Sequence, residues 1–175
     1  ADFWAKGGDA RFPEQPEIER NWRFSLYALA SSFGSAPMPG LNGLSYGPID
    51  AANPGVGSQG YTHDQNVQIP MIPFPMLGHP EFLGSMADTY LSVADVIRAE
   101  TRALFGTDGM SLPICMNQAG RMIDGGEFRY SLEGSAYSGA VMALAWRFSR
   151  DRKYLEKIYP LLDEFAAFYL GIMKK

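Results

Sequence analysis

The sequence predicts an all-α fold of paired helices, with about five helices in its 175 residues. Three observations lead to this prediction. Apolar residues recur every three or four positions in several stretches, no stretch alternates with the two-residue period of a strand, and two long loops rich in glycine and proline interrupt the helices. Short connections alternate with these long loops, which is typical of a ring of inner and outer helices. The long loops would then gather at one end of the ring, where a site can form.

The first half of the chain is predicted to hold two helices and one long loop. The first helix runs from Pro16 to Phe33, because proline suits a first helical turn and acidic residues follow it. Residues 34–62 form a loop that is dense in glycine, proline, asparagine and serine. Its apolar residues favour an ordered, site-building loop. A short second helix is predicted from His63 to Met71, where nearby prolines end it.

The second half is predicted to hold three helices. The third helix spans Pro80 to Phe105, with Gly106 as its stop. A second long loop covers residues 106–132. The fourth helix, residues 133–148, is apolar nearly all round and rich in small residues, so it should be buried on most sides. The fifth, from Tyr154 to Met173, has separate apolar and charged faces.

Composition excludes several classes of function. A net charge of −4 argues against binding a phosphate backbone, and we expect no nucleic-acid partner. No apolar run is long enough to span a membrane, and we expect no signal peptide because no basic start is followed by an apolar stretch. The single cysteine, Cys115, cannot form an internal disulfide and suits a buried thiol better than a nucleophile. With only His63 and His79 as histidines and no calcium-loop pattern, we predict no metal and no cofactor.

Five segments, in a fixed order, resemble glycoside hydrolase family 95. They are FWAKGGDARFPE…IERNWRFSLYALASSF, MPGLNGLSYGP, GYTHDQNVQIPM, FGTDGMSLPI and AYSGAVMALAWRFSRDRKYLEKIYPLLDEFAAFYLGIM. The resemblance covers essentially residues 1–175, and the order of the segments carries it more than any single motif. It implies one segment, the N-terminal part of an incomplete (α/α)₆-toroid catalytic domain of the glycosidase type. It also implies an inverting, exo-acting α-L-fucosidase or galactosidase with a carbohydrate substrate, in the periplasm or outside the cell.

The resemblance assigns two candidate catalytic residues, Asp64 and Asn66. The family carries two catalytic asparagines separated by one residue, and these two residues stand at those positions. An inverting glycosidase activates a water on the face of the sugar opposite the leaving group. The resemblance thus implies that Asp64 and Asn66 hold this water, and Asp64 is basic enough to accept its proton directly. The alternative is that Asp64 is only a helix N-cap.

Five further residues are predicted to contact substrate. Thr62 stands where the family has histidine, and His63 is displaced from that position by one residue. The five residues are Thr62, His63, Tyr46, Tyr137 and Glu133. Each has a structural alternative: His63 as a structural or solvent-facing histidine, the tyrosines as ordinary packing, and Glu133 as an acid that favours a helix start.

Half of the catalytic machinery is expected elsewhere. The family's general-acid glutamate lies in an S-P-E segment, which would fall beyond Lys175, so we expect the chain to be a segment of a longer protein. It would associate with the rest of its own catalytic domain or with another copy of itself. The rival hypothesis is a catalytically silent relative that binds glycan or serves as scaffold. Substitutions at the family's asparagine, histidine and tryptophan positions favour that rival.

Overall fold

The computed structural model describes residues 2–32, 38, 40, 60–123 and 126–174, and it confirms the all-α class. The α-helices are α1 (Asp2–Lys6), α2 (Pro16–Ser32), α3 (Pro73–Met76), α4 (Gly84–Ser92), α5 (Ala94–Phe105), α6 (Glu133–Ser149) and α7 (Arg152–Met173). The shorter elements are the 3₁₀ turns η2 (Ile69–Met71), η3 (Pro80–Leu83) and η4 (Gly126–Tyr130) and the strands β1 (Tyr61–Thr62) and β2 (Cys115–Met116).

Three of the predicted helices are confirmed nearly to the residue. Helix α2 begins at Pro16, α6 begins at Glu133, and α7 ends at Met173. Helix α7 starts two residues earlier than predicted because Asp151 caps it: its carboxylate accepts a hydrogen bond from the backbone N–H of Lys153 at 2.9 Å.

The prediction of one continuous helix from Pro80 to Phe105 is wrong, although Gly106 does end α5 in the left-handed conformation (φ 62°). The segment divides into η3, α4 and α5, and Val93 leaves the helical conformation between α4 and α5 (φ −121°, ψ 13°). Hydroxyl groups explain the break. The side chains of Thr89 and Ser92 donate hydrogen bonds to backbone carbonyls of the preceding turn, a pattern that bends helices.

The predicted helix from His63 to Met71 is also wrong. Residues 63–68 form turns, and only the 3₁₀ turn η2 follows them. The backbone N–H of His63 donates to the carbonyl of Ile114 at 2.7 Å, which ties the segment to a distant part of the chain. Pro70 and Pro73 lack the N–H groups that a continuing helix would need. The turns place Asp64 and Asn66 outside any helix.

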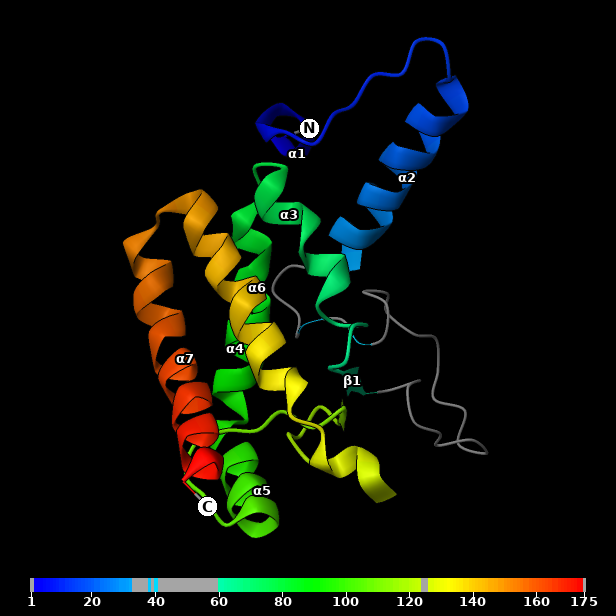
Figure 1. Cartoon of the computed structure of the whole chain (residues 1–175). Coiled ribbons are helices and arrows are strands. Elements are labelled where there is room, and N and C mark those ends of the chain that lie inside the picture. The colour runs from blue at the N-terminus through cyan, green and yellow to red at the C-terminus, as the bar shows by residue number, and fades with distance from the viewer. Residues whose placement is uncertain (1, 33–37, 39, 41–59, 124–125, 175) are drawn as a thin grey trace.

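The centre of the molecule is a layered stack of helices (Figure 1). Helices α6 and α7 form an antiparallel hairpin, which packs against α3, η3 and α4. The core between these layers consists of fully buried apolar side chains, including Tyr90 on α4, Met142 on α6 and Phe165 on α7. Helix α6 is covered on two sides, by α7 and by α3 with η3, whereas Ala136, Ala140 and Phe148 are exposed, so its predicted burial is confirmed only in part.

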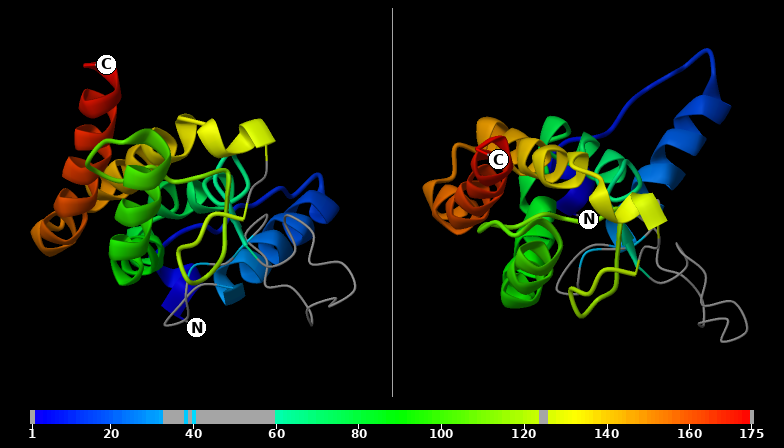
Figure 2. Two further views of the ribbon diagram at one scale, coloured as in Figure 1. Left: turned by 90° about the horizontal axis from the view of Figure 1, so that it is seen from below. Right: turned by 60° about the horizontal axis from the view of Figure 1, so that its bottom comes forward.

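Helix α2 stands away from this stack. Figure 1 and the right view of Figure 2 both show it projecting from the body of the molecule. Leu26 is its buried residue, and the indole N–H of Trp22 donates to the carbonyl of Gly8 at 2.7 Å. On another side of α2, Phe24 and Tyr27 are 70% and 65% exposed. Among the described residues, no helix is long and apolar enough to cross a membrane.

Candidate active site

The end of the first long loop meets the middle of the second in a short antiparallel pairing. Tyr61 of β1 lies opposite Met116 of β2, and Thr62 lies opposite Cys115. The sequence showed no strand, since two residues are too few to display a period of two. The pairing matters for the site because it delivers the chain directly into the turn at residues 63–68.

This turn is closed by its own backbone. The N–H of Val67 donates to the carbonyl of Thr62 at 3.1 Å, and the N–H of Ile69 donates to the carbonyl of Gln65 at 2.9 Å. The turn therefore bulges outward between β1 and η2, carrying Asp64 and Asn66 with it. Both are partly exposed, unlike Thr62 and His63 before them.

Asp64 and Asn66 lie on one open depression of about 530 Å³. Its other lining residues are Leu29 of α2, Gln65, Ile69, Pro70 and Pro73. The depression thus has three consecutive polar residues, Asp64, Gln65 and Asn66, and four apolar residues in its lining. A concave surface of this kind, apolar with a few placed polar groups, is the usual form of a small-molecule site.

The Asp64 carboxylate is not a helix cap. Its Oδ1 atom accepts a hydrogen bond from the backbone N–H of Gln65 at 2.8 Å, within the turn. No helix begins there, since the next one is the 3₁₀ turn η2, five residues later, and Gln68 is the residue that precedes η2. The structure therefore removes the helix-cap alternative and leaves Asp64 as a partly exposed carboxylate at the rim of a depression.

Thr62 and His63 face the interior instead of this depression. Thr62 is buried, with its Oγ1 atom 3.9 Å from the Sγ atom of buried Cys115. His63 is 0% exposed, and its Nδ1–H donates to the carbonyl of Pro113 at 2.8 Å. Burial lowers the pKa of His63 to about 4, against the opposing effect of that hydrogen bond, so the ring is neutral near pH 7. The structure places both residues under the turn, and their contact with substrate stays a prediction.

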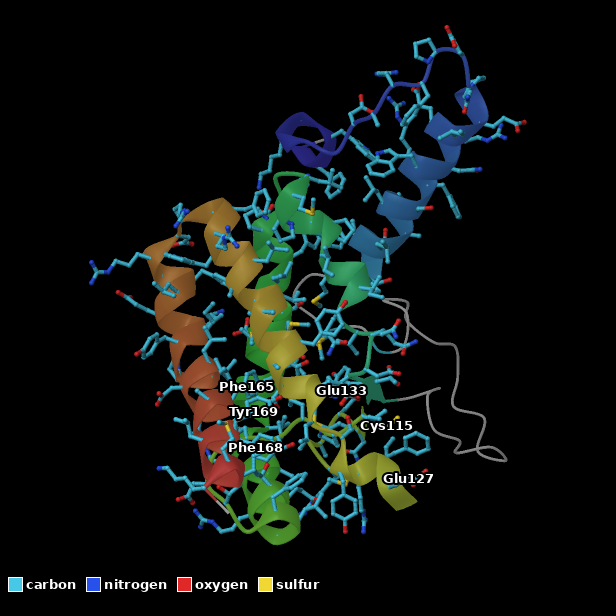
Figure 3. The ribbon with its side chains drawn as sticks, viewed as in Figure 1. Cys115, Glu127, Glu133, Phe165, Phe168 and Tyr169 are labelled. Carbon is cyan, nitrogen blue, oxygen red and sulfur yellow. The ribbon has the colours of Figure 1, made fainter. Side chains whose placement is uncertain are left out.

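The remaining predicted residues come from three parts of the chain. Glu133 is exposed at the first residue of α6, where the Ser131 hydroxyl and nearby backbone N–H groups hold the pKa of its carboxyl below the usual value. Figure 3 shows it on the side of the molecule that carries Cys115 and Glu127. Tyr137 is half-buried and packs against the core, and Tyr46 lies outside the described residues.

The start of α6 reaches the candidate site through a glycine. A Cβ atom added to Gly134 would lie 2.6 Å from the carbonyl oxygen of Leu112 and 3.1 Å from the Cβ atom of His63. Only a residue without a side chain allows this approach. It brings the first turn of α6 against Leu112 and His63.

Sequence reasoning missed the buried amide of Gln68. Its side chain is 0% exposed, and it donates hydrogen bonds to the turn and to α6. The sequence could have indicated this burial, because Gln68 is a polar residue in an apolar stretch, between Val67 and Ile69 and two residues before Pro70. A buried polar side chain is a more informative observation than a buried apolar one.

A comparison with known protein families decides the family. Residues 22–175 match the model described as the glycosyl hydrolase family 95 catalytic domain. The chain belongs to this family. No curated protein matches it. The predicted resemblance and the toroid-type, all-α class are therefore confirmed, with the helix pairs of the structure forming part of such a ring.

Membership also gives the site its chemical setting. A family 95 domain is a glycoside hydrolase domain, so its substrate class is carbohydrate. The matched residues include the turn at 63–68, the depression it borders and the whole of α6 and α7. Among the described residues, no three His, Cys, Asp or Glu side chains are grouped as metal ligands.

Proposed function

We propose that the chain supplies the water-activating half of an inverting, exo-acting glycosidase site, with Asp64 as the base and Asn66 as a second water ligand. In the reaction, the water oxygen bonds to the anomeric carbon and passes its proton to the Asp64 carboxylate. The glycosidic C–O bond breaks, and a second carboxylic acid protonates the leaving oxygen. The observation that supports this proposal most is that Asp64 and Asn66, from one turn, line the same depression.

The geometry suits a single sugar ring. A volume of about 530 Å³ is within the range of small-ligand pockets, and its apolar lining excludes water from one face of the sugar. By the family resemblance we propose α-L-fucosides as the first substrate class and galactosides as the second. We also propose an extracellular or periplasmic location. Release of nitrophenol from the two kinds of synthetic nitrophenyl glycoside would distinguish the substrate classes.

Replacing Asp64 tests the proposal. Asp64→Asn removes the proton acceptor but keeps an Oδ1 atom for the N–H of Gln65, so the fold should be retained. In the longer protein that is proposed to carry this chain, we expect kcat/KM on the preferred aryl glycoside to fall by about 10²–10⁴-fold, the usual contribution of a general base. The melting temperature should change little.

The matched control is Asp163→Asn, the same chemical change on the exposed face of α7. It should keep full activity. A purely structural role for Asp64 would give a different pattern: Asp64→Asn would keep full activity, and only Asp64→Ala, which removes the acceptor for the N–H of Gln65, would lower the free energy of unfolding, by about 0.5–1.5 kcal/mol. That result would remove Asp64 from the mechanism.

The alternative is a catalytically silent relative that binds glycan or serves as scaffold. One observation favours it, namely that His63 is enclosed and faces away from the depression. Such a protein would bind a monosaccharide in calorimetry without releasing nitrophenol from any glycoside. Turnover that Asp64→Asn abolishes would exclude it.

A further inference from the structure

A line of three buried polar side chains connects the turn at residues 63–68 to two helices. The amide Nε2 of Gln68 donates to the backbone carbonyl of His63 at 2.7 Å and to the Oγ atom of Ser138 on α6 at 3.1 Å. The hydroxyl of Tyr90 on α4 lies 3.1 Å from the same Oγ atom. All three side chains are fully buried.

Gln68 closes the turn from the inside. Its amide reaches back five residues to the carbonyl of His63, the residue directly before Asp64. Asn66 lies two residues before Gln68 in the chain. The hydrogen bond from Gln68 to His63 therefore closes the segment 63–68, which contains both candidate catalytic residues.

The other end of the turn is held as firmly. The backbone N–H of His63 donates to Ile114, and its Nδ1–H donates to Pro113. Because both bonds use carbonyls of the second long loop, they position the start of the turn against that loop. Gln68 positions its end against α6. Displacing Asp64 would require breaking one set of these buried hydrogen bonds.

Apolar packing alone would not need a glutamine here. The next buried residues along the chain include Met71 and Phe74, which are apolar members of the core, and a methionine has nearly the length of glutamine. Burying an amide among them is costly unless it is hydrogen-bonded. The hydrogen bonds of Gln68 fix the position of the turn relative to α6, which a methionine would not do.

We propose that Gln68 is a positioning residue, which holds Asp64 and Asn66 in their reactive arrangement through its hydrogen bonds to His63 and Ser138. The inference rests on the proposed function of Asp64. A displacement of about 1 Å in a catalytic group can lower a rate by about 10²-fold. The role therefore predicts a loss of rate that exceeds what the loss of stability explains.

The first test compares two variants of the full protein with similar expected stability. Gln68→Met keeps the volume and removes the hydrogen bonds. Asp151→Ala removes the cap of α7, at the far end of α6 from the turn. Both should lower the melting temperature by about 2–4 °C. Only Gln68→Met should lower kcat, by about tenfold or more, with KM changed less than about twofold. Equal effects of the two variants on kcat would overturn the proposal.

Ser138→Ala provides a second route if Gln68→Met does not fold. It removes the same contact from the α6 side and places alanine, a good helix former, within a helix. It should show the same selective loss of kcat. Retention of full kcat in folded Ser138→Ala would contradict the role of the contact with α6.

A double-mutant cycle separates this inference from the proposed function. If Gln68 acts through Asp64, then Gln68→Met should lower kcat much less in an Asp64→Asn background than in the wild type. Additive losses would mean that Gln68 acts elsewhere. If Asp64→Asn alone has no effect, the proposed function fails instead.

Amide hydrogen exchange tests whether Gln68 stabilises the turn, without any measurement of activity. In Gln68→Met, exchange of the amide proton of Val67, which closes the turn, should accelerate at least about tenfold more than exchange in the middle of α7, where the amides report the loss of global stability. Unchanged exchange at Val67 would show that the turn does not depend on Gln68.

Discussion

The buried imidazole of His63, beside the candidate site, makes the free energy of unfolding depend on pH in the acid range. Its pKa of about 4 in the folded chain compares with an ordinary value near 6.5. Between these two values the unfolded chain binds the proton and the folded chain does not. The free energy of unfolding must therefore decrease as the pH falls through this window and be fully restored near pH 7.

Thermal melting between pH 7 and pH 5 checks this coupling in a range where carboxyl groups remain mostly ionised. At about 1.4 kcal/mol for each pH unit below the ordinary value, we expect a loss of about 2 kcal/mol by pH 5. His63→Gln, which keeps a donor for Pro113, should flatten the dependence. A slope that survives His63→Gln would assign the pH dependence to other groups.

At the residue scale, the sequence pointed to Asp64 and Asn66, which line the depression, but it could not show that Thr62 and His63 are buried. The family order of motifs pointed to Asp64 and Asn66, which do border one depression. Thr62 and His63 were grouped with them because they are neighbours in the chain. Their burial depends on Pro113 and Cys115, about fifty residues away, and no local pattern reveals such a partner.

At the element scale, two helical glycines differ in the space around them: Gly134 lies against a neighbouring segment, and Gly84 does not. Gly134→Ala would place a Cβ atom 2.6 Å from the Leu112 carbonyl oxygen, which forces α6 away from the site. We expect a loss of about 1–3 kcal/mol in the free energy of unfolding, as for other overpacked positions.

Gly84→Ala is the control for that substitution. A Cβ atom there meets nothing within 4 Å, and the residue already has helical backbone angles (φ −57°, ψ −37°). It should stabilise the chain by up to about 1 kcal/mol, because alanine restricts the unfolded chain more than glycine does. Denaturant unfolding of both variants checks the pair, and equal shifts would contradict the close approach of α6.

The helices themselves were predictable to different degrees. Periodicity and the residues typical of helix ends located α2, α6 and α7, because each runs as one continuous helix. Periodicity could not show the break at Val93 within the predicted third helix. The apolar spacing continues across that position, whereas the hydroxyl groups that interrupt the backbone pattern are a local effect.

At the scale of the whole molecule, exposed apolar side chains predict association. Phe24 and Tyr27 on α2 are mostly exposed, as are Tyr159, Leu170 and Met173 on α7. Exposed apolar patches beyond a few hundred Å² usually mark a contact surface. We therefore predict that the 175-residue chain by itself pairs with another copy, binds the rest of its catalytic domain or aggregates, and does not hydrolyse glycosides alone.

Sedimentation of the isolated chain, with an aryl-glycoside assay alongside, checks this prediction. Substituting Phe24 and Tyr27 with serine should shift the distribution toward the monomer if the α2 face is the contact. A compact wild-type monomer that hydrolyses the glycoside would contradict both parts of the prediction.

The hydrogen bonds under the turn also constrain the order in which the chain folds. The contact of His63 with Pro113 spans 50 residues, and that of Gln68 with Ser138 spans 70. Each requires a long segment to close on itself, whose entropic cost is met only when the surrounding helices have already brought the ends together. The α6–α7 hairpin needs only a short connection. During synthesis, the turn at residues 63–68 can therefore reach its final form only after α6 has left the ribosome, so the candidate site is assembled after the helices that support it.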